Sequence, residues 1–452
     1  MTNQIILPSS KTFFVSQNKT YQQWAESVHF HRSIFLENPA ETWLLYCEDA
    51  YEFSVLFFAL LSAKKAIVLP QNGTANQLKS CLDEVQGVAG SQALAFENTV
   101  VYKSDGILES DVTHKNTEIT VYLNTKITLY TSGSSGKEKA IDKKLSHLLT
   151  EVKHLEACFG HLLNNSCIVS TVSHQHIYGL LFKLIWPIWT GRSVILQPYE
   201  YPEHLCHDIA KYQLGKVTLM SSPAHFHRLI KDNVYQSIST HIACMFSSGG
   251  PLSLEASLQL AEELKQSPFE ILGSTETGGI AWRQRFTVQD QYWTAFDNIK
   301  VALDDKTECL KIKSPYISQT GWYACDDKIN LISCNQFELC GRIDRIVKIE
   351  EKRVSLDHVQ QCLKALDFID DVYCSTAVNK RGLQVVAVVV LTAEAKDKLS
   401  QSRNLVFNRQ ITALLQQDLE AIAIPKRFRY IDALPYNSSG KLNKKDMEKF
   451  FD

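Results

Sequence analysis

The sequence predicts an α/β protein with a large N-terminal domain and a small α+β C-terminal domain. First, short apolar runs alternate with helical stretches as far as about Gln284, which is typical of parallel or mixed sheets. Second, the chain has 452 residues, and a single hydrophobic core rarely grows to that size. Third, the pattern changes near Gly341, where a smaller unit begins.

The first predicted elements form a strand–helix–strand unit. Trp43–Cys47 is a short apolar run, as expected of a buried strand. Tyr51–Ala63 is long enough for a helix packed on that strand, and Ala66–Leu69 is the next strand, closed by Pro70. A sheet with helices packed on it therefore begins here.

Further apolar runs extend this pattern, and helical stretches lie between many of them. The predicted strands are Ile127–Tyr130, Cys167–Thr171, Ser193–Leu196, Lys216–Met220 and Ala243–Phe246. The large domain is therefore expected to contain parallel or mixed sheets.

The chain after Gln284 has a different pattern. Residues 285–340 carry short strands with polar flanks, such as Cys309–Lys313 and Lys328–Ile332. From Gly341 on, a helix, a strand and a second helix are predicted at Val354–Leu366, Leu383–Leu391 and Ser402–Ala421. We predict that residues 1–340 form the N-terminal domain and residues 341–452 the C-terminal one.

Composition and charge argue against several classes of protein. There are 47 basic and 49 acidic residues, and this near-balance gives no indication of a basic domain that would bind nucleic acid. None of the 12 cysteines forms a C-x-x-C pair, which disfavours zinc and thioredoxin-like chemistry. No apolar run is long enough to span a membrane, and the N-terminus lacks the pattern of a signal peptide. We therefore expect a cytoplasmic protein with reduced thiols.

A loop of small and hydroxyl residues follows the strand at Ile127–Tyr130. Its backbone amides, hydroxyls and lysines could bind a polyanion, and the residues concerned are Thr131, Ser132, Gly133, Ser134, Ser135, Gly136, Lys137 and Lys139. The alternative is a flexible surface linker of ordinary Gly/Ser composition. A Walker A loop is disfavoured because only two residues separate Gly133 from Gly136, and there is no G-x-G-x-x-G for a dinucleotide.

Further motifs follow in order along the chain. They are Ser247-Ser-Gly-Gly-Pro-Leu252, Gly273-Ser-Thr-Glu-Thr-Gly-Gly279, Gly321-Trp-Tyr-Ala-Cys-Asp-Asp327, Gly341-Arg-Ile-Asp-Arg-Ile-Val-Lys348 and Pro435-Tyr-Asn-Ser-Ser-Gly-Lys441. Together with the loop, they resemble the adenylate-forming superfamily of acyl- and aryl-CoA synthetases, peptide-synthetase adenylation domains and luciferases. The resemblance spans about residues 43 to 445. It implies a large N-terminal domain of three subdomains with mixed sheets, and a small mobile C-terminal domain.

The resemblance also implies roles for individual residues in binding and activating ATP. Residues 131 to 139 would hold the phosphates, and Ser248, Gly249 and Gly250 would lie beside the adenine. Thr275 and Glu276 would act at the α-phosphate, with Glu276 holding Mg²⁺. Asp327 would bind the ribose hydroxyls, and Arg342 would make a second contact to the ribose or a phosphate. Asp344 would be the hinge of the small domain, and Lys441 would be the catalytic lysine. Taken singly, Glu276, Asp327 and Lys441 could be an ordinary helix-cap neighbour, a turn aspartate and a solvated tail lysine.

The implied reaction joins a carboxylic acid to a thiol. The acid and ATP form an acyl-adenylate with release of pyrophosphate, and the acyl group then passes to CoA or to the phosphopantetheine of an acyl carrier protein. A rotating small domain lets one cleft serve both steps. The compact chain is similar to ligases that load acyl or aryl groups onto carrier protein, including those of the aryl polyene type.

The acid is expected to meet residues from three motifs. His176 is the candidate for gating the acid, with an ordinary loop histidine as the alternative, and Ser222 and Gly273 would form other walls. No charged residue in these segments is placed to bind an amino group. An aromatic or medium-chain acid therefore fits better than an amino acid.

The sequence departs from the usual family pattern at several positions. Glu138 replaces a proline of the phosphate loop, while Asp326 and Glu351 each stand where glycine is usual. These departures keep open a second hypothesis, a non-catalytic or regulatory relative that binds adenylates. A luciferase-like oxidase is a third, and nothing in the sequence points to oxygen chemistry.

Overall fold

The structure confirms the predicted α/β fold class. The computed structural model describes residues 3–8, 11–83, 85–90, 96, 99–104, 117–132, 138–163, 165–231, 235–349, 352–379, 382–401, 404–436, 442, 446–447 and 449–451. These residues form two compact units. Unit 1 comprises residues 1–300 and 313–321; unit 2 comprises 301–312, 322–436 and the described residues from 442 on. The boundary of the predicted domains at residues 340 and 341 stays a prediction.

The first sheet of unit 1 has six strands in the order β10-β9-β5-β4-β6-β7. Their bounds are β4 Thr42–Leu45, β5 Ala66–Leu69, β6 Gly87–Ala89, β7 Val100–Tyr102, β9 Lys126–Ser132 and β10 Glu138–Lys144. Neighbouring strands are parallel except β9 and β10, which form an antiparallel hairpin. The hairpin therefore lies at one edge of the sheet, and the predicted phosphate loop connects its strands.

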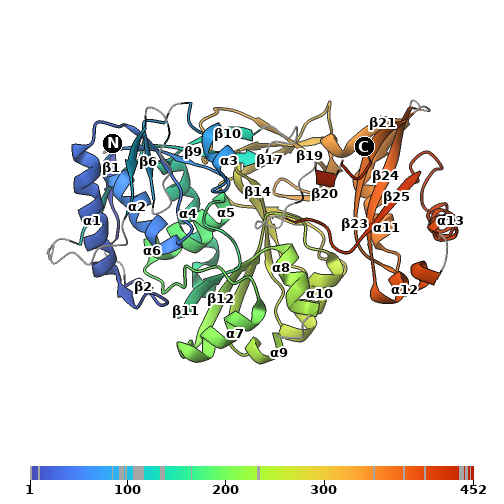
Figure 1. Ribbon diagram of the computed structural model, residues 1–452, viewed down its shortest axis with the longest axis horizontal. Coiled ribbons are helices and arrows are strands. Elements are labelled where there is room, and N and C mark those ends of the chain that lie inside the picture. The colour runs from blue at the N-terminus through green and yellow to red at the C-terminus, as the bar shows by residue number, and fades with distance from the viewer. Residues whose placement is uncertain are drawn as a thin grey trace. The chain divides into compact units, whose positions relative to one another are not determined.

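Two helices pack together beside this sheet, α1 (Tyr21–Glu37) and α2 (Ala50–Ser62) (Figure 1). Thr20 and Gln23 form a capping box that starts α1, and the Asp49 carboxylate caps α2 by accepting from the Glu52 amide. Every residue of α2 is buried, which explains its almost wholly apolar sequence.

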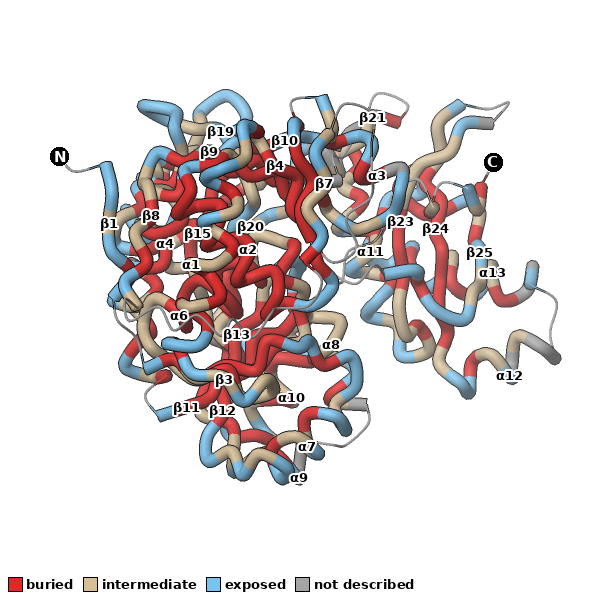
Figure 2. The backbone as a smooth tube through the Cα atoms, turned by 60° about the vertical axis from the view of Figure 1, so that its left-hand side comes forward, coloured by how far each residue is buried: buried red, intermediate tan, exposed pale blue. Residues whose placement is uncertain are grey.

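The second sheet of unit 1 contains six strands in the order β11-β12-β13-β14-β15-β16. Their bounds are β11 Ser166–Ser170, β12 Lys216–Ser221, β13 Ile242–Ser247, β14 Phe269–Ser274, β15 Gly278–Arg283 and β16 Trp293–Ala295. The first four are parallel and the last two are antiparallel to their neighbours. Figure 2 shows that this part of the chain is largely buried.

Helices cover the second sheet, as Figure 1 shows for α7, α8, α9 and α10. Their bounds are α7 Pro202–Lys211, α8 Pro223–Lys231, α9 Tyr235–Ile238 and α10 Leu254–Leu264. Leu205 and Ile209 of α7 and Phe226 of α8 pack in one buried cluster with strand residues such as Val169 and Leu219. This alternation of strands and helices is the one expected from the sequence.

The remaining elements of unit 1 are short strands and connecting helices. They are β1 Gln4–Ile6, β2 Phe13–Phe14, β3 Lys19–Thr20, α3 Ala75–Ser80, β8 Thr120–Tyr122, α4 Leu145–Phe159, η1 Gly160–Leu163, α5 Ile177–Gly179, the π-helix η2 Leu180–Ile185 and α6 Trp186–Thr190. The predicted strand at Ser193–Leu196 is wrong, because only Val194 pairs there, in isolated bridges with Phe14 and Ile168.

Unit 2 contains a four-stranded β-region and a small α+β region. Its strands and helices are β17 Lys300–Leu303, β18 Cys309–Lys313, β19 Tyr323–Leu331, β20 Gln336–Arg342, η3 Ile343–Arg345, β21 Ile346–Ile349, β22 Lys352–Ser355, α11 Leu356–Lys364, β23 Ile369–Asn379, β24 Gly382–Leu391, α12 Ala393–Gln401, α13 Asn404–Leu415 and β25 Arg427–Ile431. β17 to β20 lie side by side in sequence order.

The small α+β region has its own core. β24 lies between β23 and β25, antiparallel to the first and parallel to the second. Its alternate residues Val385, Ala387 and Val389 are buried with α11 and α13 side chains such as Val359 and Ile411. The apolar run predicted as a strand is therefore the centre of this region.

No helix within the described residues is long and apolar enough to cross a bilayer.

Candidate active site

The parallel strands of the second sheet end at one edge, and several predicted site residues lie there. Ser222 follows β12, Ser248 follows β13, and Gly273 lies near the end of β14. Ligands of open α/β sheets bind beyond the carboxyl ends of such strands. The fold therefore places these motifs at the edge where a ligand is expected.

Polar contacts join neighbouring strands along this edge. The hydroxyls of Thr171 and Ser221 lie 2.8 Å apart. The Ser248 amide donates to the Ser221 carbonyl over 3.4 Å, and the Ser248 hydroxyl donates to the Ile271 carbonyl over 2.9 Å. These bonds hold the start of the Ser248-Gly249-Gly250 turn, and Gly249 has a φ of 89°, a conformation that favours glycine.

The turn between β14 and β15 presents Thr275 and Glu276. The Ser274 and Thr277 side chains each accept a hydrogen bond from the other's amide, at 3.2 and 3.1 Å. Ser274 and Gly278 pair across the base of the turn. Thr275 and Glu276 therefore lie at the tip of a tightly bonded hairpin, and both side chains remain partly accessible.

The β9–β10 hairpin brings the phosphate-loop segment to this turn. Thr131 and Lys139 are register partners at its end, and the Lys139 Nζ lies 3.1 Å from the Glu276 Oε1. Ser132 is the last residue of β9. The other predicted loop residues, Gly133, Ser134, Ser135, Gly136 and Lys137, lie outside the described residues.

The carboxylate of Glu276 is held in its charged form. Burial acts to raise its pKa, but a hydrogen bond from its own amide and the Lys139 ammonium outweigh burial and hold the pKa below its ordinary value. An ionised, partly accessible carboxylate is a suitable ligand for Mg²⁺. Among the described residues no cluster of three or more acidic, histidine or cysteine side chains could hold a metal. Mg²⁺ in nucleotide sites is usually held by one or two carboxylates together with substrate phosphates and water, a role that the single carboxylate of Glu276 fits.

Sequence reasoning missed two buried charged residues beside this turn. Lys143 of β10 and Glu151 of α4 are 3% and 4% exposed, and each bonds to the backbone of the β14–β15 hairpin. Lys143 lies two residues after the buried Ile141 and on the same face of β10, and Glu151 lies in the apolar face of α4. A charged residue in an apolar position of each element was the signal that could have found them.

Asp327 and Arg342 are direct partners within unit 2. They lie opposite each other on β19 and β20, and the Arg342 Nη1 is 3.2 Å from the Asp327 Oδ1. The other nitrogen, Nη2, is 3.2 Å from Asp326 Oδ2. The aspartate that replaces the usual glycine therefore shares the guanidinium with Asp327.

Two other predicted residues belong to the second part of the chain. Asp344 lies in the 3₁₀ helix η3, directly after β20. Lys441, and the departure at Glu351, lie outside the described residues.

The residues predicted to line the acid pocket differ in accessibility. His176 is partly exposed at the start of α5, whereas the nearby His174 is buried, with its Nε2 2.9 Å from the Cys47 carbonyl. Burial lowers the pKa of His174 to about 3, so its imidazole is neutral. Ser222 is buried, and its hydroxyl lies 3.0 Å from the Nδ1 of His225.

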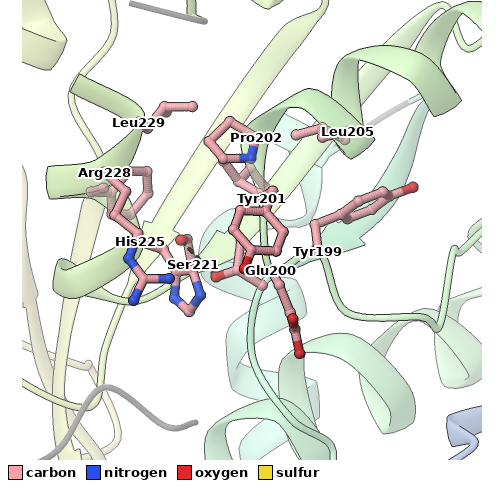
Figure 3. A pocket seen from close by; sticks show the side chains of 12 residues that line it. Tyr199, Glu200, Tyr201, Pro202, Leu205, Ser221, His225, Arg228 and Leu229 are labelled. Atoms are coloured by element: carbon pink, nitrogen blue, oxygen red, sulfur yellow. Dashed lines mark hydrogen bonds between the residues drawn. The ribbon is translucent and has the colours of Figure 1, made fainter. Parts of the chain in front are cut away.

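A small cavity lies next to Ser222 at the ends of β11 and β12. His225, Arg228 and Leu229 of α8 line it from one side and the segment from Tyr199 to Leu205 from the other (Figure 3). It encloses about 20 Å³, enough for a water molecule but not for an organic acid. The cavity therefore does not by itself define the acid pocket.

Comparison with known proteins identifies the family. A family model described as "AMP-binding enzyme" matches residues 7–309. This chain belongs to the AMP-binding enzyme family, and the resemblance to adenylate-forming enzymes drawn from the motifs is confirmed.

The similar proteins include two curated relatives and one solved structure. Vanchrobactin synthetase VabF of Vibrio anguillarum is 20% identical over 72% of this chain, which spans 13% of that protein. The putative long chain fatty acid-CoA ligase VraA of Staphylococcus aureus is 23% identical over 76% of this chain and 75% of its own length. O-succinylbenzoate coenzyme A synthetase MenE of Bacillus subtilis, solved with ATP and magnesium ion, has a TM-score of 0.75 at 16% identity, covering 98% of this chain and 100% of that one. The last likeness shows the fold.

Proposed function

We propose that this protein is an acid–thiol ligase that forms an acyl-adenylate from ATP and a carboxylic acid. Pyrophosphate leaves in the first step, and the acyl group passes to a thiol in the second. The contact between Lys139 and Glu276 carries this proposal. It joins the end of the predicted phosphate loop to the predicted metal ligand, although 137 residues separate them in the sequence.

The first step needs positive charge near the α-phosphate. The acid's carboxylate attacks the α-phosphorus, the bond to the pyrophosphate oxygen breaks, and negative charge increases on the oxygens. Lys139 lies where it can exchange its contact with Glu276 for a phosphate oxygen, because its side chain is more than half exposed. Thr275 can donate its hydroxyl to the α-phosphate.

Mg²⁺ fits this arrangement through Glu276. The ion would be held by that carboxylate together with substrate phosphates and water, which is the usual binding mode of Mg²⁺ in nucleotide sites. When bound, it would neutralise charge on the phosphates. The ordered hairpin around Ser274 and Thr277 fixes where the carboxylate points.

The remaining site residues are assigned by their match to the family motifs. We propose that Ser248, Gly249 and Gly250 contact adenine and that Asp327 and Arg342 bind the ribose. The acidic partners of Arg342 support this, because carboxylates are good acceptors for ribose hydroxyls. The loop residues at 131–137, the hinge Asp344 and the catalytic Lys441 complete the assignment.

The acid is proposed to be aromatic or medium-chain. His176, Ser222 and Gly273 lie near the carboxyl ends of the parallel strands, as walls of an acid pocket would. Ser222 and the nearby Phe226 are buried and uncharged, so these two side chains offer no ion-pair partner for an ammonium group. An amino acid is therefore a poorer substrate than an aryl or alkyl carboxylic acid.

The acceptor is proposed to be a phosphopantetheine thiol, of a carrier protein or of CoA. Incubation with ATP, Mg²⁺ and a panel of acids should yield a thioester on one of these acceptors, detected by mass spectrometry. Aromatic or medium-chain acids should give the largest yield. If ATP binds but no acid yields an adenylate or a thioester, the non-catalytic relative is favoured, and the sharing of Arg342 by Asp326 becomes its structural basis.

A further inference from the structure

Two buried charged residues, Lys143 and Glu151, bond to the β14–β15 hairpin that carries Glu276. Neither belongs to the family motifs. Lys143 lies on β10, four residues after Lys139 and on the same face of the strand. Glu151 lies on α4, the helix that directly follows β10. Both are almost fully buried.

Lys143 fixes the backbone of Glu276. Its Nζ donates to the Glu276 carbonyl over 2.9 Å and to the Tyr316 carbonyl over 3.0 Å. Lys139 contacts the side chain of the same glutamate. Strand β10 thus holds Glu276 twice, by its backbone through Lys143 and by its carboxylate through Lys139.

Glu151 fixes the other side of the hairpin. Its Oε1 accepts from the Gly279 amide over 2.7 Å. The two glycines make room for it, since a Cβ on Gly278 would lie 2.6 Å from Oε2 and one on Gly279 3.2 Å from Oε1. Gly278 also has a φ of 69°, where other residues are strained. The absence of a side chain at Gly278 and Gly279 therefore leaves space for the Glu151 carboxylate.

The same helix and strand anchor a third partner. Tyr316 is buried, and its hydroxyl lies 2.8 Å from the Asn298 amide nitrogen and 3.2 Å from the Nδ1 of His154, one turn after Glu151 on α4. Strand β10 and helix α4 therefore each bond both to the hairpin and to Tyr316.

Burying two charges for stability alone is costly, since an apolar pair of similar volume packs as well or better. Hydrogen bonds from charged groups are strong and directional, so they fix the position of the group to which they bond. The opposite charges of Lys143 and Glu151 attract each other and offset part of the cost of burial. This arrangement is suited to holding the turn between β14 and β15 in one position.

We propose that Lys143 and Glu151 are positioning residues, which hold Glu276 in the orientation that binds Mg²⁺ at the α-phosphate. This inference rests on the proposed function. Lys143 acts through the Glu276 carbonyl and Glu151 through the Gly279 amide. The network also couples the strand that leaves the phosphate loop to the metal ligand.

The test compares Lys143→Met, Lys143→Arg and Glu151→Leu with wild type, and Lys144→Met at the neighbouring exposed position is the matched control. Acid-dependent ATP–pyrophosphate exchange is measured across a Mg²⁺ titration. We expect kcat to fall about 10- to 100-fold for Lys143→Met and Glu151→Leu, as for loss of the partners that orient a metal ligand. The Mg²⁺ concentration for half-maximal rate should rise, the KM for the acid should stay unchanged, and Lys143→Arg should recover part of the rate.

Binding supplies a readout independent of turnover. Calorimetry measures the affinity for ATP with and without Mg²⁺. Mg²⁺ should raise the ATP affinity of wild type and of Lys144→Met, and it should raise that of the folded Lys143 and Glu151 variants by a smaller factor. Loss of thioester formation from preformed adenylate to the same degree as exchange would overturn the proposal. Wild-type Mg²⁺ dependence in folded Glu151→Leu would overturn it too. If Lys143→Met does not fold, the results for Lys143→Arg and Glu151→Leu decide between the two outcomes. Absence of exchange in the wild type would contradict the proposed function, while the calorimetry would still test the positioning role.

Discussion

At the scale of single residues, Glu276 is the group on which the proposed chemistry depends most. We predict that Glu276→Gln lowers the rate of acid-dependent ATP–pyrophosphate exchange at least about 100-fold, because a neutral amide neither attracts Mg²⁺ nor keeps the charge balance at the phosphates. Stability should change by less than about 1 kcal/mol, since its ion pair with Lys139 is partly exposed. Exchange rates and urea unfolding measure the two effects.

Glu308 offers a matched control for that substitution. It forms a 3.0 Å ion pair with Lys328, and its side chain is 71% exposed. Glu308→Gln should leave both exchange and unfolding at wild-type values. Equal loss of exchange in the two variants would show that Glu276 has no special role at the site.

The residue scale also shows what sequence could and could not predict. Lys139 and Glu276 were predicted as site residues from the motifs in which they stand, and the fold brings them together. Lys143 could be noticed as a charged residue on the strand face of Ile141, but its partners could not, because they depend on which strand face meets the hairpin. Glu151 likewise lies in the sequence far from the Gly279 amide that it bonds. Such long-range partners follow from packing, which no local pattern carries.

At the scale of elements, helix α1 contributes a histidine that makes stability depend on pH. His31 is buried, and its Nδ1 lies 2.6 Å from the hydroxyl of Tyr102 on β7. Burial lowers the pKa of His31 to about 4, whereas the unfolded chain protonates near 6.5. Between these values the unfolded state binds more protons, so stability falls as pH falls from 6.5 towards 4.

This histidine should contribute up to about 1.4 kcal/mol of unfolding free energy per pH unit in that window. Urea unfolding at pH 7, 6 and 5 measures the slope. His31→Gln should unfold with a smaller slope than wild type, because glutamine does not titrate. An unchanged slope would show that α1 and β7 do not hold His31 in its neutral form.

Element boundaries were predicted well where the apolar run was isolated by polar or turn residues. Ala66–Leu69 matches β5, and Leu383–Leu391 lies within β24. The run Ser193–Leu196 failed because it has strand composition but pairs only at Val194. Composition reports that a segment is apolar and β-branched, whereas a strand also needs several consecutive residues paired with a neighbouring strand.

At the scale of the whole molecule, the proposed rotation of the small domain separates the two half-reactions. We predict that Lys441→Ala abolishes adenylate formation, since its ammonium would no longer offset charge at the α-phosphate. Thioester formation from a preformed adenylate should stay near the wild-type rate, because the second step needs a different arrangement of the lid. The two rates are measured separately, and equal loss of both would contradict a rotating lid.

The overall fold class could be predicted because motif order and strand–helix alternation are properties of the whole chain. The division of the strands between two compact units could not be predicted, since β18 and β19 precede the motif at Gly341 yet lie in unit 2. That assignment depends on β19 pairing with β20, which brings Asp327 opposite Arg342.

The most direct test of the central claim is ATP–pyrophosphate exchange by the wild-type protein with aromatic, medium-chain and amino acids in parallel. We predict Mg²⁺-dependent exchange that requires an acid and is fastest with an aromatic or medium-chain one. Exchange fastest with amino acids would contradict the proposed substrate class. Tight ATP binding without exchange for any acid would contradict the assignment of this chain as an acid-activating enzyme.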